Sequence, residues 1–192
     1  GGPAEIQYRE DGTIKSQHWY RDGRLHREGD LPALIGYRDG IIELEHWYRD
    51  GRLHREGDLP AIIWYHESGA INAQYWYRDG SQHREGDLPA EIWYYESGRI
   101  KIQMWYRVDQ IHREGDLPAE IRYNESGAIR SQYWYRDGQL HREGDLPALI
   151  WYYDCGTINA EDWYHEGRLH RDGDLPAYIQ YREDGTIKSQ SW

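Results

Sequence analysis

One octapeptide, His-Arg-Glu-Gly-Asp-Leu-Pro-Ala, recurs six times along the chain and constrains the fold more than any other feature. Its first copy runs from His26 to Ala33, and its last copy has Asp172 in place of Glu. A fixed period of this length predicts a repeat array, in which each unit buries its apolar face mainly against its neighbours. The spacing is 28 residues once and 29 residues four times, between the histidines His26, His54, His83, His112, His141 and His170.

Alignment on the proline of this segment predicts a single β-repeat domain, residues 1–192, of about six and a half units. The units begin at residues 3, 32, 60, 89, 118, 147 and 176, and the last is a half unit that we expect to act as a cap. Ile6–Gln17 and Ile179–Gln190 have the same twelve residues, which favours an open array with matched ends over a closed propeller. Near-identical units indicate either recent duplication or consensus design.

Each unit begins with Ala, Ile and Tyr at alternate positions, such as Ala4, Ile6 and Tyr8, which is the period of a strand with one buried face. A turn with glycine follows, because glycine supplies the positive φ that tight hairpins require. A second strand then runs from an Ile to the Tyr after a Trp. Ile14 and Trp19 are five residues apart, so we expect a β-bulge or a strand with two apolar faces.

A second turn, Arg21-Asp22-Gly23, leads into a short third strand at residues 24–27. The Leu of that strand is replaced by Gln82 in one unit, which indicates that the position is only partly buried. The predicted fold is therefore all-β: an open tandem array of β-hairpin or meander units that forms an elongated sheet or a solenoid. We favour the extended sheet because hairpin turns dominate the pattern.

The pattern Tyr-x-x-x-Gly-x-Ile followed by Trp-Tyr-Arg-Asp-Gly-x-Leu-His-Arg, as in residues 123–129 and 134–142, resembles variant MORN repeats, tandem β-hairpins of bacteria, protists and large viruses. The resemblance covers nearly the whole chain, although the unit is longer and the octapeptide is not part of the core MORN pattern. It implies a twisted β-sheet rod that acts as a scaffold or binding module. MORN proteins are often linked to membranes or phosphoinositides, and the acidity of this chain argues against that link.

The formal charge of −11 and the absence of a basic block argue against binding to nucleic acid or to anionic membrane. No apolar run approaches the length of a membrane span, so we expect a soluble chain. With 10 Trp, 18 Tyr and no Phe, apolar burial depends largely on aromatic rings that carry polar groups.

The octapeptide histidines leave two interpretations open. His26 and Glu28, with Asp30 nearby, recur as a column that could ligate metal. We favour the alternative, in which these side chains lock the turn through hydrogen bonds and ion pairs, because no His-x-x-x-His or Cys-x-x-Cys spacing is present. The single cysteine, Cys155, lies in a predicted turn. We therefore predict no metal and no cofactor.

A catalytic site brings several different groups to one point, whereas almost every group in this chain recurs six or seven times. We therefore predict a protein that is not an enzyme.

The positions that vary lie between the Ala, Ile and Tyr of each first strand and just before each repeated Trp, and they face away from the repeated residues. Aromatic and apolar residues concentrate in the middle units, and polar residues concentrate at the two ends. This stripe is either a second packed layer or a contact surface. The candidate binding residues are Trp64, His66, Tyr75, Trp93, Tyr95, Met104, Tyr133, Trp151 and Tyr153.

Two functions follow as expectations. The first is a scaffold or protein-binding module that contacts a protein partner or a second copy of itself through the stripe. The second is a lectin-like carbohydrate-binding module that uses exposed Trp and Tyr as platforms. We expect a monomer or a defined dimer, because charged residues on the terminal hairpins oppose open-ended pairing: Arg9, Lys15, Arg182 and Lys188.

Overall fold

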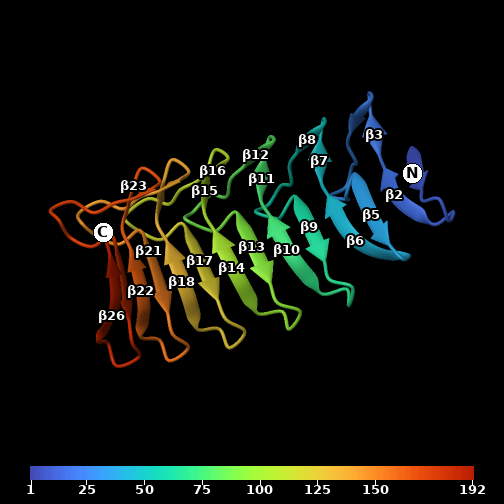
Figure 1. Cartoon of the computed structure of the whole chain (residues 1–192). Coiled ribbons are helices and arrows are strands. Elements are labelled where there is room, and N and C mark those ends of the chain that lie inside the picture. Colours follow the sequence, from blue (N-terminus) through green and yellow to red (C-terminus); the bar gives the residue numbers. More distant parts are fainter. The chain divides into compact units, whose positions relative to one another are not determined.

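The computed structural model describes residues 1–192 and consists of strands and turns without helices. The chain divides into two compact units, Gly1–Arg99 and Ile100–Trp192. Both units are built from the same two parts, a longer antiparallel hairpin followed by a short two-stranded ribbon (Figure 1). The predicted all-β array of tandem hairpins is therefore confirmed.

In the first unit, seven longer strands form an antiparallel sheet in chain order: β1 (Glu5–Tyr8), β2 (Ile14–His18), β5 (Leu34–Arg38), β6 (Ile41–His46), β9 (Ile62–Tyr65), β10 (Ile71–Tyr75) and β13 (Glu91–Tyr94). Three ribbons accompany it: β3 (Tyr20–Arg21) with β4 (Arg24–Leu25), β7 (Tyr48–Arg49) with β8 (Arg52–Leu53), and β11 (Tyr77–Arg78) with β12 (Ser81–Gln82). Each full repeat thus adds two strands to the sheet.

The second unit has the same plan. Its seven longer strands are β14 (Ile100–Met104), β17 (Glu120–Tyr123), β18 (Ile129–Tyr133), β21 (Leu149–Tyr152), β22 (Ile158–Asp162), β25 (Tyr178–Tyr181) and β26 (Ile187–Ser191). Its ribbons are β15 (Tyr106–Arg107) with β16 (Gln110–Ile111), β19 (Tyr135–Arg136) with β20 (Gln139–Leu140), and β23 (Tyr164–His165) with β24 (Arg168–Leu169).

The repeated Trp marks the point where the chain leaves the sheet. The Trp19 N–H donates to the Ala33 carbonyl at 2.8 Å, and the Trp19 carbonyl accepts from the His26 N–H at 3.0 Å. The predicted second strand therefore ends at His18, and the predicted third strand pairs with β3 in a ribbon of its own rather than with the sheet.

A β-bulge in the hairpin explains the odd spacing of the repeated Ile and Trp. Gln7 lies opposite Ser16, but Tyr8 lies opposite Ile14, so Lys15 is an extra residue on β2. The bulge confirms one of the two alternatives that the spacing left open, and it returns Ile14 to the face that carries Tyr8. The same shift recurs in the β5–β6, β9–β10, β17–β18, β21–β22 and β25–β26 hairpins.

The ribbon turns require two consecutive residues with positive φ. Asp22 (φ 49°) and Gly23 (φ 73°) adopt this conformation, which suits the type I′ turn and the residues that prefer it. The β15–β16 ribbon instead has Val108 at φ 46° and Asp109 at φ 65°. A β-branched residue with positive φ is strained, so this is the turn whose sequence fits its backbone least well.

Burial is greatest beside the octapeptide. The Ala that ends it is fully buried in five copies, and the repeated Trp is buried in every repeat except the last, where Trp192 is exposed. The Leu of each octapeptide remains exposed, with an exposed fraction between 42% and 47%: Leu31, Leu59, Leu88, Leu117, Leu146 and Leu175.

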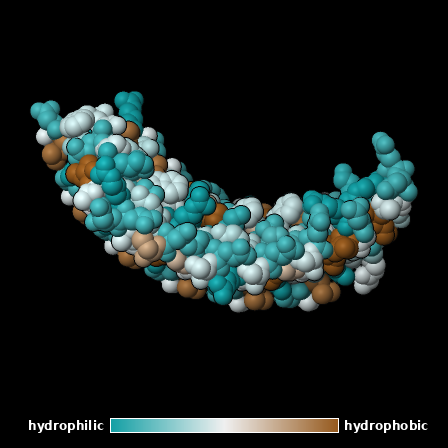
Figure 2. Space-filling view, turned by 60° about the horizontal axis from the view of Figure 1, so that its bottom comes forward, coloured by the Kyte–Doolittle hydropathy of each residue, from teal (hydrophilic) through white to brown (hydrophobic).

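Hydrophilic side chains cover most of the surface seen in Figure 2, with hydrophobic residues scattered among them. No helix with the length and hydropathy needed to cross a membrane occurs in the structure.

Candidate functional site

The sheet has two chemically different faces. We call the side with the Ala, Ile, Tyr and Trp of each repeat the repeated face, and the opposite side the variable face. In the β5–β6 hairpin, Ile35 belongs to the repeated face, whereas Leu34 and Gly36 lie on the variable face opposite His46 and Leu44.

On the repeated face, a Trp, an Arg and an Asp clamp successive repeats together. The Arg142 guanidinium lies 4.0 Å from the centre of the buried Trp134 ring, and its Nε and Nη2 donate to the Asp116 carboxylate at 2.9 Å each. The Trp134 indole N–H donates to the Asp116 carbonyl at 3.1 Å. The same stacking joins Trp19 to Arg27, Trp47 to Arg55, Trp76 to Arg84, Trp105 to Arg113 and Trp163 to Arg171.

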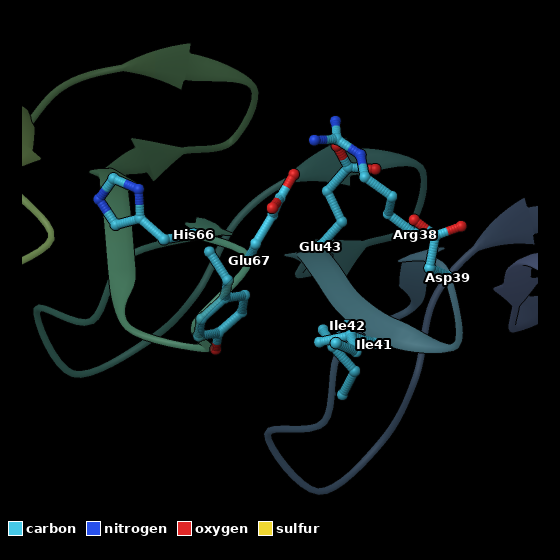
Figure 3. Close-up of a pocket in the computed structure, with 8 residues that line it drawn as sticks. Arg38, Asp39, Ile41, Ile42, Glu43, His66 and Glu67 are labelled. Atoms are coloured by element: carbon cyan, nitrogen blue, oxygen red, sulfur yellow. The ribbon is translucent and has the colours of Figure 1, made fainter.

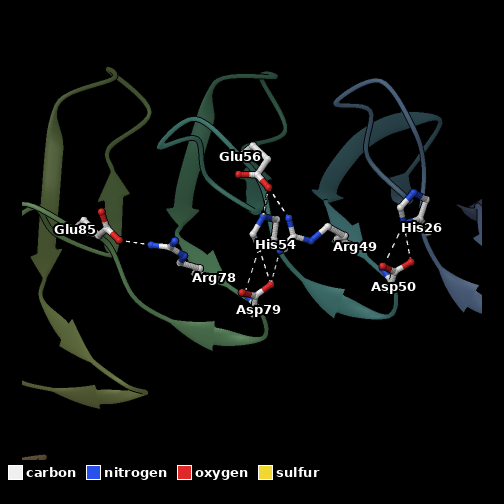
Figure 4. A network of polar contacts seen from close by, with 8 residues as sticks. All are labelled: His26, Arg49, Asp50, His54, Glu56, Arg78, Asp79 and Glu85. Carbon is white, nitrogen blue, oxygen red and sulfur yellow. Dashed lines mark hydrogen bonds and ion pairs between the residues drawn. The ribbon is translucent and has the colours of Figure 1, made fainter.

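The octapeptide histidines form a second link between repeats (Figure 4). His54 Nδ1 accepts from the backbone N–H of Asp79 at 3.2 Å, which places the ring hydrogen on Nε2, 2.9 Å from the Glu56 carboxylate. Arg49 donates to Glu56 at 2.5 Å and to Asp79 at 2.6 Å. His26 makes the matching contacts with Glu28 and Asp50.

These contacts support the structural interpretation of the His, Glu and Asp columns. His54 and Asp58 bond to the adjacent repeat, whereas Glu56 bonds to His54 and Arg49 of its own repeat. No group of three or more His, Cys, Asp or Glu is arranged to hold a metal ion. Cys155 is exposed in a hairpin turn, 3.1 Å from the Thr157 hydroxyl.

In the first unit, the variable face brings predicted site residues together on adjacent strands. The ring centres of Tyr75 and Trp93 are 6.0 Å apart at an interplanar angle of 77°, and those of His46 and Trp64 are 6.3 Å apart. All four side chains are half-buried. The stripe is thus intermediate between the two alternatives, since its rings pack edge to face but keep part of their surface in solvent.

In the second unit, Tyr133 and Trp151 make the equivalent contact, with ring centres 6.0 Å apart at 72°. Tyr133 is buried, whereas Trp151 and Met104 are half-buried. The Met104 sulfur accepts a hydrogen bond from the Tyr106 hydroxyl at 3.6 Å.

The remaining predicted site residues, His66, Tyr95 and Tyr153, lie where the hairpins end and are half-buried. His66 Nε2 is 3.3 Å from the Tyr94 carbonyl, and the Tyr153 hydroxyl donates to the Tyr181 carbonyl at 2.8 Å. Two of these three residues therefore tie one hairpin to the next.

A small cavity lies beside His66, between the β5–β6 and β9–β10 hairpin ends (Figure 3). Its volume is about 110 Å³, and Ile41, Ile42 and the Arg38–Glu43 ion pair line it. This is smaller than the pockets that usually hold small molecules.

The variable face also buries polar groups that the sequence patterns did not single out. Gln82, expected to be partly buried, is buried, and its amide donates to the Glu91 carboxylate at 3.1 Å. The Trp93 indole N–H donates to the same carboxylate at 2.6 Å. The substitution of Leu by Gln82 is thus matched by a buried acid. The other members of this column are half-buried or exposed, as predicted: Leu25, Leu53, Ile111, Leu140 and Leu169.

Glu120 is 2% exposed and is the most deeply buried acid of the second unit. Its carboxylate accepts from Arg122 Nε at 2.5 Å and from the Tyr135 hydroxyl at 3.3 Å. The Arg122 guanidinium also lies 4.9 Å from the Tyr133 ring centre. This acid is therefore neutralised within the variable face.

Two titratable groups on the variable face have no charged partner. Burial lowers the pKa of His46 to about 4, and its Nε2 is buried without a hydrogen-bond partner. Burial raises the pKa of Asp162 to about 6, and a hydrogen bond from Trp151 offsets part of the rise. One sequence signal could have identified Asp162, since it is the only acid in the column His18, His46, Tyr75, Met104, Tyr133, Asp162 and Ser191.

Comparison of the sequence with protein-family models and with curated proteins gives no match. The structure shows an all-β protein of regular tandem hairpin repeats of about 29 residues.

Proposed function

We propose that this protein is a non-enzymatic β-repeat scaffold whose variable face binds a protein partner. The difference between the two faces carries this proposal. The polar side chains of the octapeptides form hydrogen bonds within and between repeats, whereas the variable face changes from repeat to repeat and presents half-buried aromatic rings.

The composition of the variable face suits a protein interface. Trp, Tyr and Arg are the residues that contribute most to interface hot spots, because they combine large apolar area with hydrogen-bonding groups. Trp64, Trp93 and Trp151 each lie on the first strand of a hairpin, and Arg122 occupies the same strand position in another repeat.

The charged groups of this face support a binding role more than a catalytic one. Glu120 and Arg122 neutralise each other, and Glu91 accepts from Gln82 and Trp93. His46 and Asp162 belong to different units. A reaction centre would require groups of unlike chemistry at a single point.

Peptide selection tests the proposal. The intact chain is used to select from a displayed random peptide library, and the selected peptides are titrated against the variant Trp64→Ala/Trp93→Ala/Trp151→Ala. The matched control is Leu59→Ala/Leu88→Ala/Leu146→Ala, which changes three exposed octapeptide leucines. We expect at least about tenfold weaker binding only in the Trp variant, provided its circular dichroism is unchanged.

Selected peptides that bind the folded Trp variant as tightly as the intact chain would rule out the variable face as the contact surface.

Sedimentation at micromolar concentration tests the expected monomer or defined dimer, and open-ended polymers would contradict it.

A lectin-like function is the alternative, and the pairing of Trp with an acid favours it. Trp93 donates to Glu91, and Trp151 hydrogen bonds to Asp162, so a flat aromatic ring lies beside a carboxylate twice. Sugar rings stack on such faces and donate hydroxyl hydrogen bonds to such acids. A glycan array probed with the same variants tests it, and binding that persists in the Trp variant would contradict it.

We also propose that the hairpins are related to MORN repeats. Support comes from the motif of residues 123–129, which spans the turn from the end of β17 to the start of β18. Strand register provides the test, because a MORN hairpin without the one-residue bulge after its Ile would argue against a common origin.

A further inference from the structure

An open cavity of about 390 Å³ lies on the variable face of the second unit. Leu149 and Trp151 of β21, Ala160 and Asp162 of β22, and Tyr178 of β25 line it. Its volume falls within the range of sites that hold small molecules or single side chains.

The cavity exists because two aromatic rings of the first unit have small polar counterparts here. In the first unit, Ala73 lies between Trp64 and Trp93 in the register of the strands, and Tyr75 packs against Trp93.

In the second unit, Ala160 lies between Trp151 and Gln180. Asp162 occupies the position that corresponds to Tyr75. The first unit thus fills with aromatic rings the region that the second unit leaves open.

Asp162 is an acid without a counter-ion. It forms no ion pair in the structure, and no cationic side chain contributes to its pKa. Burial raises this pKa to about 6, and the hydrogen bond from Trp151 offsets part of the rise. A carboxylate that is partly removed from water and has no counter-charge is stabilised by a cation that enters beside it.

The aromatic groups around Asp162 suit an organic cation, whereas Arg130 at the rim opposes it. Tyr164 on β23 and Tyr178 on β25 have pKa values raised by burial and then by the Asp162 charge, so both are neutral at pH 7. Arg130 on β18 is exposed and lines the cavity. Aromatic faces attract ammonium groups through the ring quadrupole, and Trp is the strongest of them.

We propose that this cavity binds an alkylammonium group, with Asp162 as the counter-ion and Trp151 and Tyr178 as its walls. The group is either a lysine side chain of the partner protein or a free small amine. The inference rests on the proposed function, because it names the chemistry of one site on the variable face.

Calorimetric titration of the intact chain tests the inference at low salt, at pH 7.5 and pH 5.0. The probes are tetramethylammonium chloride, the peptide acetyl-Gly-Lys-Gly-amide and, as the uncharged control, acetyl-Gly-Gln-Gly-amide. We expect one or both cations to bind at pH 7.5 and the glutamine peptide not to bind. Binding at pH 5.0 should be about tenfold weaker, because only about one tenth of the carboxylate is ionised one unit below its pKa.

Three variants and one control variant locate the site. Asp162→Asn should weaken binding at least about tenfold, whereas Glu183→Gln, which removes one exposed acid from a hairpin turn, should leave it unchanged. Gln180→Trp keeps Asp162 but restores the ring found beside Ala73, and it should also remove binding. Arg130→Ala should tighten binding slightly, because a like charge leaves the rim.

The outcomes separate this inference from the proposed function. Binding of the lysine peptide points to a protein lysine, and binding of tetramethylammonium alone points to a free amine. Absence of binding by both cations at millimolar concentration, or equal losses in Asp162→Asn and Glu183→Gln, would overturn the ammonium site. Peptide selection that still depends on the three tryptophans would leave the proposed function standing in that case.

Discussion

The two faces of the same sheet treat charge in opposite ways. On the repeated face, Asp116 receives two hydrogen bonds from Arg142, which itself lies flat on Trp134. On the variable face, Asp162 has no cationic partner and a pKa of about 6. Interactions that hold repeats together recur along the chain, whereas the acid without a counter-ion occurs at a single position.

The largest expected effect separates the two faces by stability. Trp134→Ala removes a buried ring, its stacking with Arg142 and the hydrogen bond to Asp116, so we expect a loss of about 3–5 kcal/mol in the free energy of unfolding. Trp151→Ala, on the half-buried variable face, should lose about 1–2 kcal/mol. Urea unfolding followed by circular dichroism measures both, and equal losses would contradict the distinction between the faces.

The next effect concerns His46, whose pKa of about 4 lies below the usual 6.5 because the ring is buried. The unfolded chain binds the proton of His46 more readily than the folded chain does. The contribution of the neutral His46 to stability is therefore complete above about pH 6.5 and is lost as the pH falls towards 4. His46→Tyr introduces the residue found at Tyr75. The difference in free energy of unfolding between this variant and the unchanged chain should therefore shift by about 2 kcal/mol in favour of the variant from pH 7.5 to pH 5. Urea unfolding at the two pH values measures this gain.

Asp162 changes the free energy of unfolding in the opposite direction. Because its folded pKa is raised, Asp162 increases the stability as the pH falls from about 6 to about 4. The comparison is therefore made in an Asp162→Asn background. His170→Gln, at a histidine whose side chain is 58% exposed, serves as the control and should show little change. An unchanged pH profile in His46→Tyr would show that His46 is not held neutral by burial.

A smaller effect tests the one ribbon turn without glycine, which has Val108-Asp109. Val108→Asp with Asp109→Gly gives the β15–β16 ribbon the residues that positive φ favours, and we expect a gain of about 1–2 kcal/mol. The reverse change, Asp22→Val with Gly23→Asp, should lose a similar amount. Thermal unfolding measures both, and a destabilised Val108 variant would mean that the valine has a packing role that outweighs its strain.

The smallest effect is expected at the exposed end of the clamp. Asp58 pairs with Arg84 through two hydrogen bonds but is 53% exposed, so Asp58→Asn should lose less than about 1 kcal/mol at pH 7. The hydrogen bonds from Arg84 lower the pKa of Asp58, so its contribution is present above about pH 4 and is lost below that. The loss in Asp58→Asn should therefore shrink at pH 3, and a loss that stays the same would exclude the ion pair as its cause.

Much of the fold could be predicted because hairpin signals are local. The alternation of Ala4, Ile6 and Tyr8 and the glycines of the turns report backbone conformation over a few residues. Even the bulge at Lys15 was among the alternatives, since the spacing of Ile14 and Trp19 left few others. The same alternation predicts which residues share the variable face, because successive side chains of a strand point to opposite faces.

What remained out of reach depends on contacts between individual side chains. The Leu column is partly buried, as its single Gln predicts, but Gln82 itself is buried because Glu91 of the next repeat accepts its hydrogen bond. The burial of Glu120 depends on contacts within its own repeat, with Arg122 on the same strand face and with Tyr135 of the following ribbon.

Periodicity within one repeat is enough to predict the period, the hairpins, the turns and the division into two faces. Only the folded chain shows which side chains meet: Arg142 with Asp116 of the preceding repeat, and Trp151 with Asp162 of the adjacent strand, beside an open cavity. The physical reason is strand register, which joins residues that are far apart along the chain and sets how much water each charge keeps.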